Sequence, residues 1–136
     1  MTIKKAPAHD RLLTEVELEI MNVVWEAEDC TIRDVHEALA KNRPVAYTSV
    51  ATIMKILEQK KVLASKKGDK AHTYFPVVPR AEYEATSLRH LTCNVFRGDP
   101  SSMMMRLLDE SELSTDELKE IRNILNGRLG KQGKSL

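Results

Sequence analysis

Residues 47–61 carry two stripes of side chains at helical spacing, and no other feature of the chain constrains its fold as strongly. The first stripe is apolar and repeats at i, i+3, i+4 and i+7: Val50, Ile53, Met54 and Leu57. The second stripe lies opposite and consists of Thr48, Thr52, Lys55 and Gln59, with Ser49 beside it. The pattern predicts an amphipathic helix with one face in a core and the other exposed to solvent.

The exposed face of this helix differs from an ordinary solvated face. Such faces usually mix glutamate with lysine in pairs one turn apart, whereas this one has a single lysine, no acid and several short hydroxyl side chains. Short side chains leave room for a close approach to phosphates and base edges. We therefore expect this face to meet nucleic acid.

After Lys61 the spacing of apolar residues changes from helical periodicity to alternation. Residues 62–67 and 71–76 are predicted to form two strands, which a short turn at Gly68-Asp69-Lys70 joins. Basic or imidazole side chains surround the tip of this hairpin: Lys66, Lys67, Lys70 and His72.

Two helices are predicted before residue 47. Thr14 and Glu17 have the spacing of a capping box, and apolar residues follow at helical spacing, so a helix is expected over 15–26. Thr31 is expected to cap a second helix that ends before Pro44, because proline cannot continue a helix. The single tryptophan, Trp25, is expected in the core.

Residues 79–129 are predicted to form three short helices with narrow apolar stripes. The first covers about 80–96, the second is capped by Ser101 or Ser102, and the third follows a capping box at Ser114 and Glu117. Helices of this size bury little surface alone, so we expect a second copy of the chain to cover them. The expected dimer contacts are Leu88, Leu91, Val95, Phe96, Met104, Leu107, Leu108, Leu118, Ile121 and Leu125.

Three helices followed by a basic hairpin are the order of a winged helix-turn-helix domain. The predicted fold is therefore mainly α with a small β-hairpin. It consists of a winged-helix DNA-binding domain at 13–78 and a short helical dimerisation region at 79–129. A flexible arm at 1–12 and a polar tail at 130–136 are expected at the ends.

Charge is distributed unevenly along a chain whose net charge is only +1. Residues 10–37 hold nine acids against two bases, whereas residues 41–72 hold eight bases against Glu58 and Asp69. This block indicates a face suited to an anion. The expected DNA contacts are Thr31, Arg33, Arg43, Tyr47, Thr48, Ser49, Thr52, Lys55, Lys66, Lys67, Lys70 and His72.

Five runs of residues resemble the BlaI/MecI/CopY penicillinase-repressor family of transcriptional regulators. LTEVELEIMNVVW at 13–25 resembles its opening helix, and IRDV at 32–35 its second helix. AYTSVATIMKIL at 46–57 and AHTYFPV at 71–77 resemble its recognition helix and wing. LSTDELKEIRNIL at 113–125 is similar to its last dimerisation helix. The resemblance extends in unbroken order over roughly residues 11–129.

This resemblance implies a dimeric repressor bound to a dyad-symmetric operator of double-stranded DNA. It also implies release when a membrane sensor protease system triggers proteolysis, or when metal binds in the copper-responsive branch. The antibiotic-resistance repressors are cut at an Asn–Phe dipeptide, and the matching position here, the possible cleavage region, is Arg106-Leu107. The Cys-x-Cys pair of the copper branch is missing from the sequence after Gly130. The inducing signal therefore stays open.

Other functions are weaker matches to the sequence. Motifs of catalytic sites are not found, so we expect no enzyme and no cofactor. His90 and Cys93 lie near Met103–Met105 and have the donor types of a Cu(I) site, but two ligands are too few, so no metal site is predicted. A metal- or redox-responsive regulator using Cys30 or Cys93, and a protein docking module, stay as alternatives. Without an apolar run of about 18 residues or a signal peptide, a cytoplasmic protein with no direct membrane insertion is expected.

Overall fold

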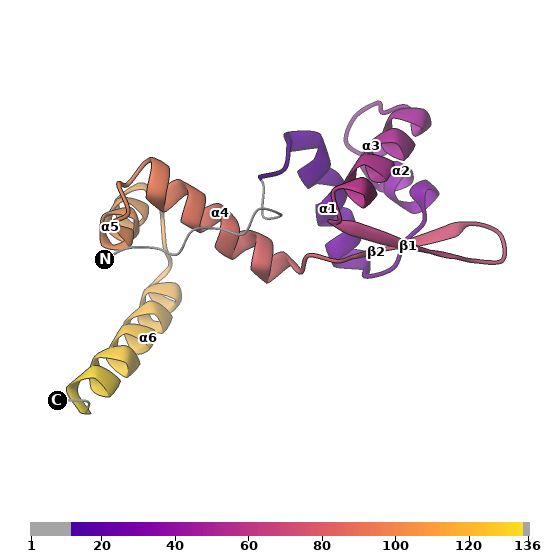
Figure 1. Ribbon diagram of the computed structural model, residues 1–136. Helices are drawn as coiled ribbons and strands as arrows, with labels where there is room; N and C mark the ends of the chain where they lie inside the picture. Colours follow the sequence, from indigo (N-terminus) through magenta and orange to yellow (C-terminus); the bar gives the residue numbers. More distant parts are fainter. Residues whose placement is uncertain (1–11, 135–136) are drawn as a thin grey trace.

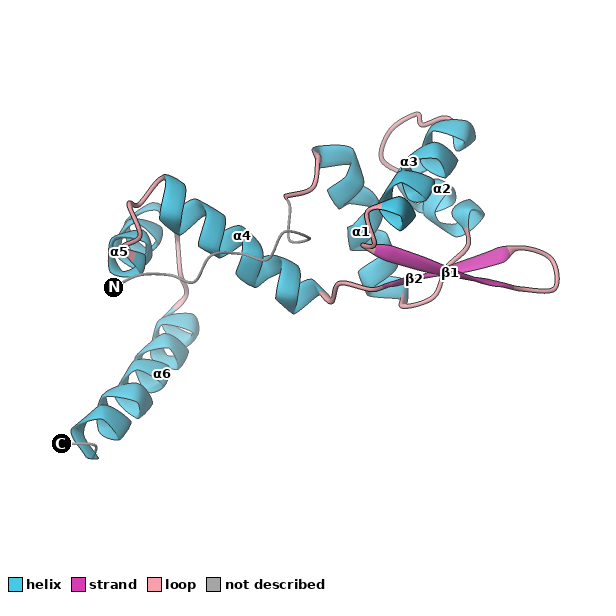
Figure 2. Cartoon of the chain, viewed as in Figure 1, coloured by secondary structure: helices cyan, strands magenta, loops and turns pink. Residues whose placement is uncertain are grey.

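The computed structural model describes residues 12–134, which form six helices and one antiparallel hairpin (Figures 1 and 2). The elements are α1 (Glu15–Ala27), α2 (Ile32–Ala40), α3 (Tyr47–Gln59), β1 (Leu63–Lys67), β2 (His72–Pro76), α4 (Arg80–Asn94), α5 (Pro100–Glu110) and α6 (Thr115–Lys134). The predicted mainly α fold with a small hairpin is confirmed. The expected flexible arm at 1–12 lies outside the described residues except for Leu12.

Local side-chain caps begin most of these helices, as expected from short-range spacing. In α1 the Glu17 N–H donates to Thr14 Oγ1 (3.2 Å) and the Thr14 N–H donates to Glu17 Oε1 (2.9 Å), which confirms the capping box. Thr31 caps α2 as predicted, and Ser114 with Glu117 makes the same reciprocal pair before α6.

The predicted cap of α5 is wrong. Asp99 is the N-cap instead of Ser101 or Ser102, because its carboxylate accepts from the Ser101 N–H (3.1 Å) and from the Ser102 hydroxyl (2.6 Å). Pro100 then occupies the first helical position, where a missing N–H costs nothing. The serines are donors to the cap rather than the cap itself.

The hydrophobic core lies between α1, α2, α3 and the hairpin. Its buried members are Ile20, Met21, Val24, Cys30, Val35, Leu39, Val50, Met54, Leu57, Val62, Leu63 and Tyr74. Burying one side chain of this size contributes about 1.5–3 kcal/mol. Trp25, which we expected in the core, packs half-buried at its edge. This core fixes the orientation of α3 and of the hairpin.

A short stretch between α1 and α2 adds to the hairpin, which the sequence analysis did not anticipate. Cys30 and Tyr74 form an isolated antiparallel bridge, with the Cys30 N–H donating to the Tyr74 carbonyl (3.0 Å) and the Tyr74 N–H donating to the Cys30 carbonyl (2.7 Å). Because Thr31, the cap of α2, comes one residue later, the bridge places the start of α2 beside the middle of β2.

The hairpin itself agrees with the prediction to within one residue. Leu63 pairs with Pro76 at its base and Lys67 pairs with His72 next to the turn. The turn requires a glycine at its first position, because a Cβ on Gly68 would lie 2.5 Å from the Ala71 carbonyl oxygen. This hairpin is the wing of the domain.

The last three helices extend away from the core, with α4 as the connection (Figure 1). Helix α6 continues to Lys134 and so extends past the predicted end near residue 129 into the expected polar tail. Gly130 lowers helix propensity by about 1 kcal/mol but leaves the backbone hydrogen bonds intact, so it does not end the helix. None of the helices within residues 12–134 is both long and apolar enough to cross a membrane.

Candidate nucleic-acid interface

Helix α3 presents the two faces that its sequence predicts. Val50, Met54 and Leu57 are buried against the core, whereas Thr48, Ser49, Thr52 and Lys55 are exposed. The first two turns of the exposed face form a shallow depression that Thr48, Ser49 and Thr52 line together with Ile53. Three of the four residues that line the depression therefore carry small hydroxyl side chains.

A groove of about 810 Å³ lies between the start of α2, α3 and the wing. Its lining includes five residues that we expected to contact DNA: Thr31, Arg33, Tyr47, Lys55 and His72. Because these residues come from three different elements, the tertiary structure brings together what is spread over about 40 positions of the sequence. The groove is continuous with the wing on one side and with α3 on the other.

The Thr52 hydroxyl has a partner inside its own helix. Its Oγ1 donates to the Thr48 carbonyl oxygen at 2.9 Å, one turn earlier. This bond uses the hydroxyl hydrogen, so the oxygen lone pairs and the methyl group are what Thr52 can offer to a ligand. Ile56, one turn later, is 38% exposed and was not among the expected contacts.

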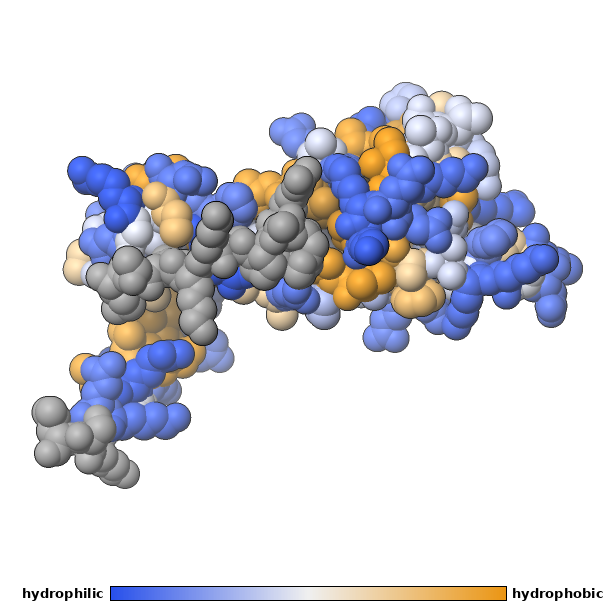
Figure 3. All heavy atoms as spheres, viewed as in Figure 1, coloured by the Kyte–Doolittle hydropathy of each residue, from blue (hydrophilic) through white to orange (hydrophobic). Residues whose placement is uncertain are grey.

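The wing carries the expected cluster of positive charge. Lys66, Lys67, Lys70 and His72 are all exposed, and hydrophilic side chains cover this end of the molecule (Figure 3). Lys66 Nζ lies 3.8 Å from Asp29 Oδ2, and both side chains are more than half exposed. An exposed pair at this distance contributes little, so the ammonium group stays free to exchange partners.

Two of the expected arginine contacts have acidic partners. Arg33 pairs with Glu37 on the same helix at 3.1 Å, and both are exposed beside the groove. Arg43 pairs with Glu19 of α1 at 2.7 Å, and this hydrogen bond raises the pKa of Arg43 above its ordinary value. Arg43 lines neither the groove nor the depression on α3.

Tyr47 packs against the turn that leads into α3 and is also partly exposed. Its ring meets the His36 ring edge-on, with centroids 5.6 Å apart, and 48% of its surface is exposed. His36 Nε2 lies 2.8 Å from the Val45 carbonyl oxygen, which holds this turn to α2. Tyr47 therefore combines a packing contact with an accessible position on the groove.

A contact that the sequence analysis missed joins the wing to α3. The Ser65 hydroxyl of β1 donates to the Glu58 carboxylate in the last turn of α3, and both residues line the groove. Nothing in the spacing of Ser65 and Glu58 indicates this pair, because it depends on how the hairpin folds back. The pair joins β1 to the last turn of α3 across the groove lining.

Burial and the neighbouring Lys60 charge have opposite effects on the pKa of Glu17, the residue that joins α1 to the end of α3. Burial alone would raise the pKa of this 4% exposed carboxyl group. The hydrogen bond from Lys60 (2.7 Å), the bonds from Thr14 and the positive charge of Lys60 outweigh burial and hold the pKa of Glu17 below its ordinary value. Glu17 is therefore ionised in the folded protein at neutral pH.

The expected dimer contacts lie on the surface of the isolated chain. Phe96 and Ile121 are half-buried, and the others are exposed: Leu88, Leu91, Val95, Met104, Leu107, Leu108, Leu118 and Leu125. Within residues 12–134, no helix covers the side of α5 that carries Met104, Leu107 and Leu108. Hydrophobic side chains gather visibly where α6 begins (Figure 3).

The remaining candidates lie apart from the groove. Arg106 and Leu107 are exposed in the middle of α5. His90 is half-buried and Cys93 exposed on α4, and residues 12–134 contain no group of three or more His, Cys, Asp or Glu side chains that could hold a metal ion. Cys30 is buried, and its burial, followed by the charges of Asp34 and Asp29, raises the pKa of its thiol to about 11.

Comparisons with known proteins give a consistent result. The sequence model of the penicillinase repressor matches residues 13–127. The methicillin resistance regulatory protein MecI of Mammaliicoccus sciuri is 25% identical over 114 residues, which cover 84% of this chain and 93% of that protein. The transcriptional regulator BlaI of Mycobacterium tuberculosis is 39% identical over 74 residues, or 54% of each chain.

Among solved structures, monomeric BlaI of Bacillus licheniformis in complex with the blaP half-operator aligns with a TM-score of 0.48 at 23% identity. The alignment covers 54% of this chain and 89% of that one. The match to the family sequence model begins two residues before α1 and ends within α6. The chain therefore belongs to the penicillinase repressor family of transcriptional regulators.

Proposed function

We propose that this chain represses transcription by placing the exposed face of α3 in the major groove of operator DNA. The observation that carries the proposal is the depression lined by Thr48, Ser49 and Thr52, which lets the backbone of α3 approach base edges closely. Lys55 and the groove beside it continue this surface toward the wing. Membership of a family of transcriptional regulators supports the same role.

Within this proposal, the residues divide by what they contact. Thr48, Ser49, Thr52 and Lys55 contact base edges, and the exposed side chain of Ile56 packs against a thymine methyl group. The expected contacts at the start of α2 and on the wing, and Tyr47 at the start of α3, bind phosphates. Arg43 contributes only after it leaves Glu19.

A second copy of the chain completes the proposed repressor. Apolar side chains on α4, α5 and α6 are exposed over about half of their surface or more, for example Leu88 (51%), Leu107 (61%) and Leu125 (51%). A surface of this kind on three consecutive helices is typical of an obligate interface. A symmetric dimer would place two α3 helices on a dyad-symmetric operator.

Release from DNA by proteolysis is part of the same proposal. In the single chain α5 contains no buried residue, so outside the dimer it opens locally at low cost, and a protease needs such opening to cut Arg106–Leu107. A cut there separates α6 from the DNA-binding domain and removes part of the proposed dimer surface. The membrane sensor protease system that the resemblance implies would supply the signal.

The alternatives have less support. A docking surface usually presents large apolar or aromatic anchors, whereas three of the four residues that line the depression on α3 carry small hydroxyl side chains, and the exposed Tyr47 beside it packs against His36. A redox sensor needs a reactive thiolate, and burial keeps Cys30 protonated near neutral pH because its pKa is raised to about 11.

Selection from a pool of random double-stranded DNA by the full-length chain tests the proposed function. We expect recovery of a dyad-symmetric sequence, followed by protection of both half-sites in a footprint. A matched selection with Thr52→Ala should recover less of that sequence at equal protein concentration. Recovery of unrelated sequences with the same low affinity would contradict the proposal.

A further inference from the structure

The first turns of α4 contact both ends of α1, and Arg80 also forms an ion pair with Glu26 in the last turn of α1 (3.7 Å). The Trp25 indole N–H donates to the Val78 carbonyl oxygen at 2.9 Å, just before α4 begins. The Tyr83 ring lies 5.7 Å from the Trp25 ring between centroids, and the Arg80 guanidinium lies 5.4 Å from the centre of the same tryptophan ring. Trp25 therefore contacts the segment before α4 and two residues of its first turn.

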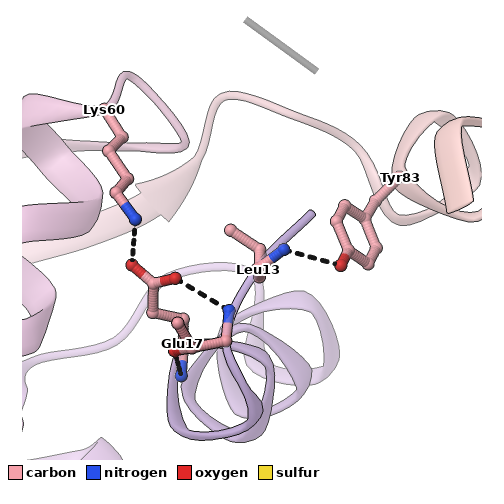
Figure 4. Close-up of polar contacts among 5 residues, drawn as sticks. Leu13, Glu17, Lys60 and Tyr83 are labelled. Atoms are coloured by element: carbon pink, nitrogen blue, oxygen red, sulfur yellow. Dashed lines mark hydrogen bonds and ion pairs between the residues drawn. The ribbon is translucent and has the colours of Figure 1, made fainter. Parts of the chain in front are cut away.

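Tyr83 also reaches the opposite end of α1. Its hydroxyl oxygen accepts a hydrogen bond from the Leu13 N–H at 2.9 Å, immediately before the cap residue Thr14 (Figure 4). This contact spans 70 positions of sequence. It attaches α4 to the start of α1, in addition to the tilted contact between the Tyr83 and Trp25 rings at the end of α1.

The same turn of α1 is tied to the DNA-facing helix. One oxygen of the Glu17 carboxylate accepts from the Thr14 N–H (2.9 Å), and the other accepts from Lys60 Nζ (2.7 Å), the residue that ends α3 (Figure 4). Leu13 binds Tyr83 of α4, and its neighbour Thr14 binds Glu17, which in turn binds Lys60 at the end of α3. We call this set of contacts the joint, and it relates the direction of α4 to the position of α3.

A small change in the tilt of α4 at this joint produces a large displacement of the far end of the helix. A helix of 15 residues is about 22 Å long, so a tilt of about 10° moves its end by about 4 Å. One base-pair step of DNA is about 3.4 Å. Because α5 and α6 lie beyond that end (Figure 1), the tilt sets how far the α3 helices of two copies stand apart.

We propose that Tyr83 is a positioning residue that determines which half-site spacing the repressor accepts. The inference rests on the proposed dimeric repressor, but the placement of α4 can be measured without DNA. Tyr83→Phe keeps the ring on Trp25 and removes only the oxygen that accepts from Leu13. Ser87→Ala is the matched control, because it removes a hydroxyl whose hydrogen bond, to the Tyr83 carbonyl (2.9 Å), lies within α4.

The first arm measures the direction of α4 by electron spin resonance between labels on Cys93 and on Ala40→Cys at the end of α2. Cys93 is exposed and out of register with the Leu88, Leu91 and Val95 stripe, and Cys30 is buried from the label. Labelled chains are diluted with unlabelled chains so that distances within one chain dominate. We expect one narrow distribution for wild type and Ser87→Ala, and a broadened distribution for Tyr83→Phe. Equal widths for all three proteins would overturn the role of Tyr83.

The second arm uses the dyad-symmetric duplex recovered by selection, with versions that gain or lose one base pair between the half-sites. We expect Tyr83→Phe to lose about fivefold of the preference for the selected spacing, the change that corresponds to one net hydrogen bond of about 1 kcal/mol. Affinity for an isolated half-site should stay as in wild type. An unchanged preference would overturn the assignment of Tyr83 alone, whereas a wild-type protein without any spacing preference would overturn the proposed dimeric repressor as well.

Discussion

Thr52 lies one turn after Thr48 on the exposed face of α3, and its hydroxyl hydrogen is already bonded to the Thr48 carbonyl. At an exposed helix site such a bond has little influence on stability. The bond does not involve the methyl group of this exposed residue, which is available to pack against a thymine methyl group in the proposed complex. The side chain thus has one apolar and one accepting function available.

We predict that Thr52→Ala weakens binding to the selected operator by about 1–3 kcal/mol without a change in melting temperature. Thr52→Val keeps a methyl group in a similar position and should retain most of the affinity. Binding curves on operator and on scrambled DNA at one salt concentration, with a melting curve for each protein, measure the difference. Wild-type binding by Thr52→Ala would show that this face of α3 does not read DNA.

At the scale of elements, the Glu17–Lys60 pair connects the first turn of α1 to the end of α3. The folded protein holds the pKa of Glu17 below its ordinary value. A lowered pKa means that the pair stabilises the fold above the pKa of the unfolded chain, about 4.3 for a glutamate. That stability is lost as the pH falls through the lower pKa of the folded state.

We predict that Glu17→Gln lowers the free energy of unfolding by about 1 kcal/mol at pH 7, because a charged hydrogen bond becomes a neutral one. The difference from wild type should shrink as the pH is lowered below about 4.3, where the wild-type carboxyl group also becomes protonated. Urea unfolding between pH 3 and pH 7 measures it. Glu15→Gln, at an exposed site in the same turn, is the control, and a difference that grows toward acid would contradict the role of the pair.

The wing is a second element with a separable role, because its lysines are exposed and lie beyond the groove. We predict that alanine at Lys66, Lys67 or Lys70 reduces the slope of log affinity against log salt by about 1 for each phosphate that the variant no longer binds. Operator and unrelated DNA should weaken about equally. Lys119→Ala on α6 should leave the slope unchanged. A changed sequence preference with an unchanged slope would show that the wing contacts bases.

For the whole molecule, the exposed apolar surface of α4, α5 and α6 is the dominant feature. Leu118, Ile121 and Leu125 share one stripe of α6, and Leu125 is 51% exposed in the single chain. The three helices make few contacts with the DNA-binding domain beyond the Trp25 and Tyr83 joint. A second copy would cover this surface and couple the two DNA-binding domains.

We predict that Leu125→Glu gives a folded monomer that binds the full operator much more weakly, because the coupling of two half-sites is removed. Asn123→Glu, on the other side of α6, should stay dimeric. Sedimentation measures the mass of both proteins, and circular dichroism checks that each is folded. A dimer that survives Leu125→Glu with unchanged operator affinity would place the interface elsewhere.

Much of this molecule follows from interactions over three or four positions, which a sequence displays directly. The capping pairs at Thr14 and Ser114 and the two faces of α3 depend only on helical spacing, so they could be predicted residue by residue. The cap of α5 was missed because Asp99, Ser101 and Ser102 are three candidate caps within four positions. The end of α6 was missed because a glycine weakens a helix without stopping it.

Tertiary structure alone decided the contacts between distant segments. The Cys30–Tyr74 bridge, the Ser65–Glu58 pair and the Tyr83–Leu13 bond join residues whose own neighbours give no sign of a partner. The sequence by itself determined which residues are exposed on α3 and charged on the wing. The groove between them, and the direction in which α4 leaves the domain, arise only when the core packs, because burying one shared apolar surface fixes the angles between elements that local spacing leaves free.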